Sequence, residues 1–229
     1  MIKDYLKITG RSLVGNGSNT IILFFLCSIF SAYSQPTKRY NLAKLQIENK
    51  LEPTMDNQHI QALDSPKNQG LSVKGIVWLK GVTFKEGVVD VDLKAKNVLD
   101  QSFVGIAFYG IDTNNYSVVY FRPFNFHIAD TLRRQHAVQY ECFPDYSWDK
   151  LRMKHPLIYE HPVNPVPEAD KWFHATIVVK KDSITVYVNR ARTASLNVKK
   201  LDNSNGGKIG LWTFSDGVSG DFANLTITE

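Results

Sequence analysis

The chain has 229 residues, of which 43% are hydrophobic and 21% are charged, and its formal net charge is +5. This composition is that of a globular protein with enough apolar surface for a core. The basic residues are scattered and form no basic stripe, which excludes the electrostatic footprint of a nucleic-acid-binding protein. We therefore interpret the charge as a solubility property and expect one large domain.

Residues 1–34 have the layout of a secretory signal peptide. The basic residues Lys3, Lys7 and Arg11 precede an apolar run at 21–30, and small residues lie before a cleavage point after Ser34. The run is short for a membrane span, which needs about 20 residues. We expect export to the periplasm, the cell surface or the medium, with membrane contact only through this segment; an uncleaved anchor is the alternative.

Cleavage after residue 34 leaves a single cysteine, Cys142. One thiol makes no internal disulfide and no thiolate metal site, so stability has to come from the core. Within a strand pattern, Cys142 is expected to act as a small buried hydrophobic side chain. The histidines show no metal-ligand spacing, and no metal-binding residue is assigned.

Residues 35–57 are polar and mixed, and we expect a lead-in segment there with a short helix near 42–51. From residue 58 onward, strand signals dominate. Residues 88–96 read VVDVDLKAK, which alternates apolar and charged side chains as a strand with one wet face does. Similar strands are predicted at 73–79, 102–109, 116–121, 135–143, 172–180, 184–189, 194–198, 208–214 and 221–228.

These short strands are separated by polar turns and not by helices. Residues 181–183, for example, form a turn that predicts a hairpin between the strands 172–180 and 184–189. The pattern indicates an all-β antiparallel sandwich over residues 58–229, without a second domain. Residues 143–167 interrupt it, and they hold many of the prolines together with Trp148. We expect this loop to cover one rim of the sandwich.

Alternation within the central strands predicts a groove on the outer face of one sheet. Tyr120, Arg122, Gln139 and Glu141 point to that face, beside the tiny residues of the strand 102–109, namely Gly105 and Ala107. Arg122 in this groove is either a ligand contact or half of a structural ion pair, with Glu141 as its expected partner.

A polar groove with aromatic walls suits carbohydrate, because aromatic rings pack on the apolar face of a sugar and planar polar groups bond its hydroxyls. The predicted stacking residues are Trp148 and Trp212, although Trp212 in a strand is also a candidate for the core. Asn125, shortly after Arg122, joins Tyr120, Arg122 and Gln139 as a predicted ligand-binding residue.

The order of motifs resembles the concanavalin A-like lectin/glucanase superfamily over residues 58–229. The resemblance rests on the strands around GVVDVDL (87–93) and FVGIAF (103–108), the hairpin end VYVN (186–189) and GKIGLW (207–212). It is nearest to exported 3-keto-disaccharide hydrolase domains and laminin G-like modules. The resemblance implies a jelly-roll sandwich and a carbohydrate ligand; it also implies loop calcium sites, for which Asp112, Asn114 and Asn115 are candidates, although no cofactor is expected.

The glucanase branch of that superfamily carries Glu-x-Asp-x-x-Glu, and this chain does not. Glu168 and Asp170 occupy the first two positions, but Phe173 stands at the third. A hydrolytic site would therefore need other carboxylates around the groove, and the candidates are Glu141, Asp145 and Glu160. Three functions stay open: a carbohydrate-binding domain, a glycoside hydrolase, and a laminin G-like module that binds another protein.

Overall fold

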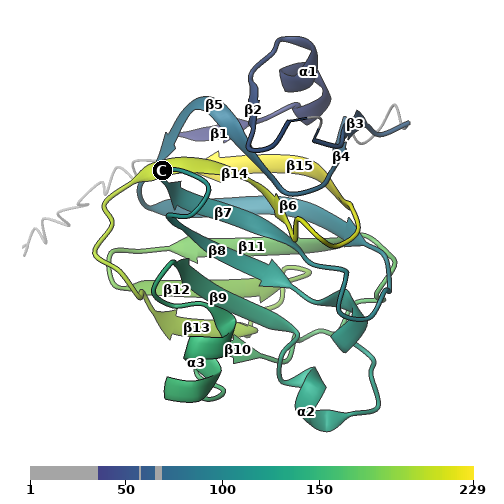
Figure 1. Ribbon diagram of the computed structural model, residues 1–229, viewed down its shortest axis with the longest axis vertical. Helices are drawn as coiled ribbons and strands as arrows, with labels where there is room; N and C mark the ends of the chain where they lie inside the picture. Colours follow the sequence, from purple (N-terminus) through teal and green to yellow (C-terminus); the bar gives the residue numbers. More distant parts are fainter. Residues whose placement is uncertain (1–35, 57, 65–68) are drawn as a thin grey trace, which may run out of the picture. The chain divides into compact units, whose positions relative to one another are not determined.

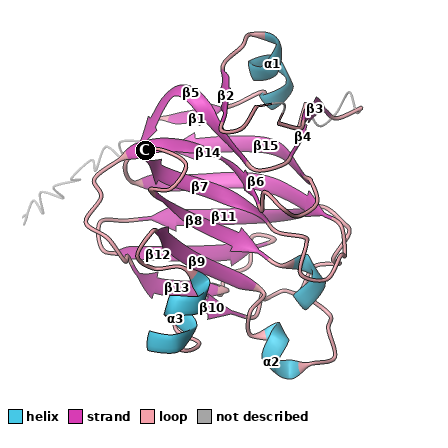
Figure 2. Cartoon of the chain, viewed as in Figure 1, coloured by secondary structure: helices cyan, strands magenta, loops and turns pink. Residues whose placement is uncertain are grey.

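The computed structural model describes residues 36–56, 58–64 and 69–229, and the predicted signal peptide of residues 1–34 lies outside these ranges. Within the described residues, the strands form two antiparallel sheets that lie face to face (Figure 1, Figure 2). The eight-stranded sheet contains β1 (Thr37–Arg39), β3 (Ile60–Ala62), β4 (Leu71–Val73), β6 (Gly87–Ala95), β11 (Phe173–Val179), β12 (Ser183–Val188), β13 (Leu196–Lys199) and β15 (Gly220–Thr228). The seven-stranded sheet contains β2 (Leu51–Pro53), β5 (Ile76–Phe84), β7 (Val104–Gly110), β8 (Tyr116–Phe121), β9 (Val138–Phe143), β10 (Glu160–His161) and β14 (Gly207–Thr213).

The strand order shows how the chain crosses between the sheets. The eight-stranded sheet runs β13-β12-β11-β6-β15-β4-β3, with β1 also pairing with β15, and the other runs β10-β9-β8-β7-β14-β5-β2. The two C-terminal strands therefore lie inside their sheets, β15 beside β6 and β14 between β7 and β5. Such long crossovers are typical of a jelly roll. The predicted antiparallel sandwich is confirmed, including the hairpin of β11 and β12.

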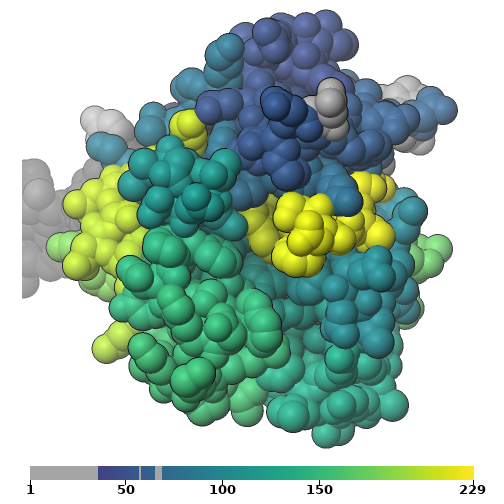
Figure 3. All heavy atoms as spheres, viewed as in Figure 1, coloured from purple at the N-terminus to yellow at the C-terminus, as the bar shows by residue number. Residues whose placement is uncertain are grey.

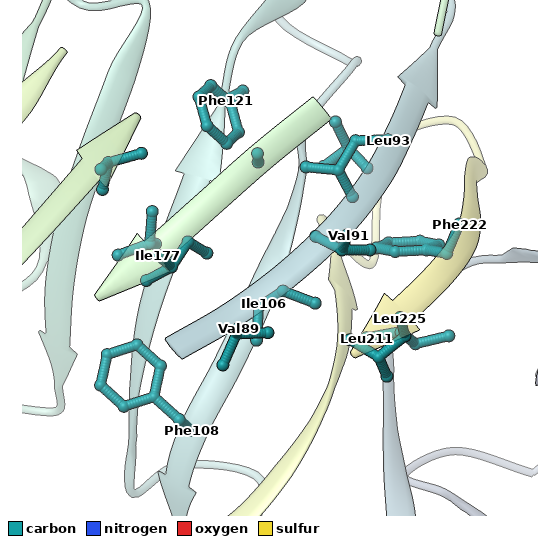
Figure 4. Close-up of a cluster of buried hydrophobic side chains, with 14 of the residues drawn as sticks. Val89, Val91, Leu93, Ile106, Phe108, Phe121, Ile177, Leu211, Phe222 and Leu225 are labelled. Atoms are coloured by element: carbon teal, nitrogen blue, oxygen red, sulfur yellow. The ribbon is translucent and has the colours of Figure 1, made fainter. Parts of the chain in front are cut away.

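The core lies between the two sheets (Figure 4). Val89, Val91 and Leu93 of β6 point toward the other sheet, where Ile106 and Phe108 of β7 meet them, and all five side chains are buried. The alternation predicted for residues 88–96 is thus confirmed. Burial of each such side chain is worth about 1.5–3 kcal/mol relative to its exposure, so this layer is the main source of stability.

One predicted strand is wrong. Residues 73–79 read as one apolar run, but the structure ends β4 at Val73 in one sheet and starts β5 at Ile76 in the other. Gly75 lies between them with φ +79°, a left-handed conformation that glycine adopts without steric cost. The hydrophobic run therefore crosses from one sheet to the other, because both halves face the same core.

The segment before residue 58, predicted as a lead-in, contributes strands to both sheets. β1 pairs with β15 and β2 pairs with β5, and α1 (Leu42–Ile47) connects them. Asn41 begins this helix, and its side chain accepts a hydrogen bond from the backbone N–H of Lys44, as N-cap residues do. In this structure residues 36–56 are thus part of the sandwich.

Two further helices flank β9 in sequence: α2 (Thr131–Arg134) precedes it, and α3 (Trp148–Lys154) follows it. They lie at the lower right and lower left of Figure 1, and in the space-filling view their green and teal residues gather at the end away from the blue N-terminal strands (Figure 3). No helix in the described part of the chain is long and apolar enough to cross a membrane.

The outer face of the eight-stranded sheet carries a histidine held by two carboxylates. His174 Nδ1 lies 2.8 Å from Asp92 Oδ1, and Nε2 lies 3.1 Å from Asp90 Oδ1. Hydrogen bonds to Asp90 and then to Asp92 raise the pKa of His174 to about 9 from 6.5. Because the folded state favours the protonated ring, this contribution to stability is complete below pH 6.5 and is lost as the pH rises through 9.

We expect His174→Asn to flatten this pH dependence. Between pH 6.5 and 9 the melting temperature of the wild type should fall more steeply than that of the variant, because the variant has no proton to lose there. Thermal unfolding over a pH series at constant ionic strength measures both slopes. Equal slopes for the two proteins contradict the assignment.

Candidate functional site

The outer face of the seven-stranded sheet is covered by a second layer of side chains. Strand register places Gln139, Tyr120, Gly105 and Trp212 in one row across β9, β8, β7 and β14. The rings of Tyr120 and Trp212 lean together over Gly105, with centroids 4.9 Å apart. The groove predicted over Gly105 and Ala107 is therefore filled by aromatic rings, and Ala107 is fully buried.

Gly105 is required by this close packing. A Cβ atom there would lie 2.1 Å from the carbonyl oxygen of Val119 and 2.7 Å from Cβ of Tyr120. Since backbone atoms cannot move aside cheaply, we expect Gly105→Ala to lower the free energy of unfolding by about 1–3 kcal/mol. Chemical denaturation measures the loss, with Lys80→Ala at an exposed position of β5 as control. A Gly105→Ala protein as stable as the control contradicts the packing.

A pocket of about 710 Å³ opens beside this layer, and we call it the outer pocket. Its apolar lining consists of Phe103, Tyr120, Phe124, Leu132, Phe143, Trp148, Trp212 and Phe214. Its polar lining consists of Asp100, Arg122, Asn125, Asp130, Arg133, His136, Glu141, Ser147 and Arg152. A cavity of this size, with aromatic walls and several convergent polar groups, is typical of a small-molecule site.

Arg122 lies in the floor of the outer pocket with a side chain that is only 7% exposed. One guanidinium nitrogen, Nη2, donates to the Tyr120 hydroxyl at 2.6 Å and to Gln139 Oε1, and the other, Nη1, donates to the backbone carbonyl of His136 at 2.9 Å. The carboxylate within ion-pair distance is Glu160, at 3.9 Å. Arg122 does not pair directly with Glu141 as predicted. The Tyr120 hydroxyl lies between them, accepting a hydrogen bond from Arg122 and donating one to Glu141.

Glu141 is buried to 1% exposure and still lines the outer pocket. Its Oε1 accepts a hydrogen bond from the Tyr120 hydroxyl, and its Oε2 accepts one from the backbone N–H of Trp148 at 3.0 Å. Burial raises the pKa of the Glu141 carboxyl to about 7, against the lowering effect of Tyr120 and Arg122. The group therefore changes its charge near neutral pH, inside the pocket.

Trp148 begins α3 within the predicted rim loop of residues 143–167, and its side chain is 50% exposed. The guanidinium of Arg152, one turn later, lies 5.1 Å from the centroid of its ring. The backbone N–H of Trp148, at the start of α3, donates a hydrogen bond to Glu141. The exposed indole is thus fixed at the margin of the pocket, where it can stack on a ligand.

The other two predicted catalytic carboxylates have different surroundings. Glu160 accepts hydrogen bonds from Arg152 at 2.9–3.2 Å and lies 2.8 Å from His136 Nδ1, and it does not line the outer pocket. Asp145 is exposed and also lies outside the lining. Of the three predicted carboxylates, the structure therefore brings only Glu141 into the pocket.

The predicted ligand-binding residues come together, with one difference. Tyr120, Arg122, Asn125, Trp148 and Trp212 all line the outer pocket. Gln139 lies beneath it, fully buried, where its Oε1 accepts from Tyr120 at 3.1 Å.

Several pocket residues were not predicted from the sequence, namely Phe103, Phe124, Phe143, Phe214, Leu132, His136 and Arg152. Phe103 carried a usable signal, because alternation in the strand 102–109 puts it on the same face as Gly105. Phe143 carried the same signal, because it ends β9 two residues after Glu141. The others come from loops and helices, where strand alternation gives no direction.

The candidate calcium loop does not fit a metal site. Asp112 Oδ1 accepts backbone N–H bonds from Asn114 at 2.7 Å and Asn115 at 2.9 Å, and both carboxylate oxygens accept from the Asn115 side chain. These bonds close a turn, which is the usual role of Asp and Asn there. In the described part of the chain, no group of three or more His, Cys, Asp and Glu side chains is arranged to hold a metal.

No family model matches the chain, and no curated protein matches its sequence. Among solved structures, the chain is similar to a Bacillus subtilis protein with a galectin-like fold, with a TM-score of 0.53 and 11% identity over 83% of this chain and 94% of that chain. It is also similar to a "putative glycosyl hydrolase" from Parabacteroides distasonis, with a TM-score of 0.51 and 16% identity over 79% of this chain and 100% of that chain. For the carbohydrate-binding module CBM66 from Bacillus subtilis, the TM-score is 0.49 and the identity 14%, over 77% of this chain and 100% of that chain. The strand order of the two sheets and the matches to the first two structures show that this chain has a concanavalin A-like jelly-roll sandwich fold.

Proposed function

We propose that this protein binds a neutral carbohydrate in the outer pocket. The observation that carries the proposal is the joint placement of a half-exposed indole, Trp148, and a buried carboxyl, Glu141, in one pocket above the Tyr120 and Trp212 rings. An indole offers a flat apolar surface to a sugar ring, and a carboxylate accepts hydrogen bonds from its hydroxyls. Solved structures of similar fold include proteins named for carbohydrate binding and hydrolysis, although the likeness is one of fold.

The charge balance of the pocket floor supports a neutral ligand. Arg122 and Arg152 are two cations, and Glu141 and Glu160 are two anions within the same hydrogen-bonded group. Glu141 keeps free lone pairs for a ligand, because a carboxylate has about four acceptor sites and only two bonds are formed here. The N-terminal residues 1–34 further support export of the protein before it meets this ligand.

We expect Trp148→Ala to weaken glycan binding by about 10–100-fold, because the variant loses the exposed stacking surface of the pocket. Trp172→Ala is the matched control, since Trp172 is a partly buried tryptophan that does not line the pocket. Calorimetric titration with a panel of neutral oligosaccharides measures both variants. Equal affinities for Trp148→Ala and Trp172→Ala contradict the proposed site.

Glycoside hydrolysis is the second candidate, and the raised pKa of Glu141 favours it. A carboxyl that titrates near pH 7 in a pocket is suited to act as a general acid or base. The other two carboxylates of the lining already have hydrogen-bond partners. Asp100 pairs with Arg133, and Asp130 accepts hydrogen bonds from backbone N–H groups at the start of α2. Product analysis after incubation with oligosaccharides tests this candidate; turnover that is abolished in a folded Glu141→Gln variant supports it, and turnover by the variant contradicts it.

A further inference from the structure

The two sides of the outer pocket differ in chemistry. Toward α3, the lining presents the polar groups of Glu141, Ser147 and Arg152 together with the indole of Trp148 and the ring of Phe143. Toward α2, where β7 and β9 begin and β8 and β14 end, the apolar part of the lining consists of Phe103, Phe124, Leu132 and Phe214. A ligand that fills both sides therefore needs one hydroxyl-rich end and one apolar end.

The phenylalanines of the apolar side are packed edge to face. The ring of Phe103 meets Phe124 at a centroid distance of 5.4 Å and an angle of 80°, and it meets Phe214 at 5.3 Å and 62°. Phenylalanine rings carry no polar atom, so Phe103, Phe124 and Phe214 form a hydrocarbon wall that offers a sugar hydroxyl no hydrogen-bond partner. Phe214 is 40% exposed and Leu132 58% exposed, so the wall keeps apolar surface that a ligand can cover.

The charged groups on this side already have partners. Arg133 donates to both carboxylate oxygens of Asp100, at 3.1 and 3.2 Å. Asp130 accepts the backbone N–H of Leu132 at 2.9 Å and that of Arg133 at 3.2 Å. An anionic or cationic ligand end would have to break these pairs, whereas an uncharged apolar end leaves them intact.

We propose that the outer pocket takes a glycoside whose aglycone is an apolar group of the size of an aromatic ring. The sugar lies on Trp148 and bonds Glu141, and the aglycone packs against Phe103, Phe214 and Leu132. This inference rests on the proposed function, because it assigns the second half of the same ligand.

The test compares glycosides that share one sugar and differ only in the aglycone. Methyl and phenyl glycosides of glucose, galactose and mannose, in both anomers, are titrated into the purified protein by calorimetry. We expect at least one sugar for which the phenyl glycoside binds about tenfold or more tightly than the methyl glycoside, because the phenyl ring buries more apolar surface. In the double variant Leu132→Ser and Phe214→Ser, this preference should fall below about threefold.

The controls separate the two halves of the ligand. Ile111→Ser replaces an exposed apolar residue outside the pocket and should keep the full preference. Glu141→Gln should weaken both glycosides and leave their ratio unchanged. Equal binding of the phenyl and methyl glycosides, or a preference that survives the double variant, overturns this inference and leaves the proposed function standing. No binding of any of these glycosides also overturns this inference, whereas the proposed function is decided separately by the panel of neutral oligosaccharides.

Discussion

Replacing Arg122 with methionine is expected to lower the free energy of unfolding by about 3–5 kcal/mol. The variant keeps a side chain of similar length but removes the donor to the Tyr120 hydroxyl, Gln139 and the His136 carbonyl, all in buried surroundings. These acceptors lose a charged donor without gaining water, and the loss of a buried hydrogen bond to a charged group is costly. Thermal unfolding should show a fall in melting temperature on the order of 10 °C.

Arg133→Met is the matched control for this prediction. Arg133 also pairs with a carboxylate, Asp100, but its side chain is 37% exposed, so water replaces the lost partner. Exposed pairs of this kind contribute little to stability, because water screens them. Arg122→Lys adds a second comparison, because it keeps the charge and loses the planar fork of donors. If Arg122→Met and Arg133→Met lose similar stability, Arg122 does not hold the floor of the outer pocket together.

Glu141→Gln is expected to weaken glycan binding by about tenfold or more above pH 8, since a hydrogen bond to a charged group is worth about 1.5–3 kcal/mol. Burial places the pKa of Glu141 at about 7, so the carboxylate that accepts the sugar hydroxyls forms as the pH rises through 7. The wild-type affinity should therefore increase between pH 6 and 8, while that of Glu141→Gln stays nearly constant over the same interval.

The control for Glu141 is Asp145→Asn, at an exposed carboxyl that does not line the pocket. It should bind with the wild-type affinity and the wild-type pH dependence. Calorimetric titrations at several pH values, with melting temperatures of all three proteins as a check of folding, give both quantities. A Glu141→Gln protein with the same pH dependence as the wild type shows that another group titrates with binding.

Much of the fold could be predicted because strand alternation reports directly which side chains face the core. In β6, for example, the inward residues Val89, Val91, Leu93 and Ala95 are all buried. The errors fall where the backbone turns locally. At Gly75 an apolar run leaves one sheet and enters the other. Strict alternation from Gly105 and Ala107 would put Tyr109 on the outer face, but Tyr109 lies in the core with a φ of 56°, next to a register shift between β7 and β14.

The candidate site could be predicted where its residues lie on strands. Tyr120 lies in β8, Arg122 directly follows β8, and Glu141 lies in β9. All three side chains are on one face of the sheet, so the alternation of the two strands places them together. Their partners could not be predicted in this way. Arg152 comes from α3 and Glu160 from β10. Arg152 pairs with Glu160, and Glu160 reaches Arg122 and His136, only because the chain folds back after β9. Such contacts depend on the path of a loop, which periodicity does not encode.

The most direct test of the proposed site is calorimetric titration of the purified protein with a panel of neutral oligosaccharides and glycosides, repeated with the double variant Glu141→Gln and Trp148→Ala. The site predicts saturable binding of at least one sugar by the wild type and loss of that binding in the folded double variant. No binding by the wild type, or equal binding by the two proteins, contradicts a carbohydrate site in the outer pocket.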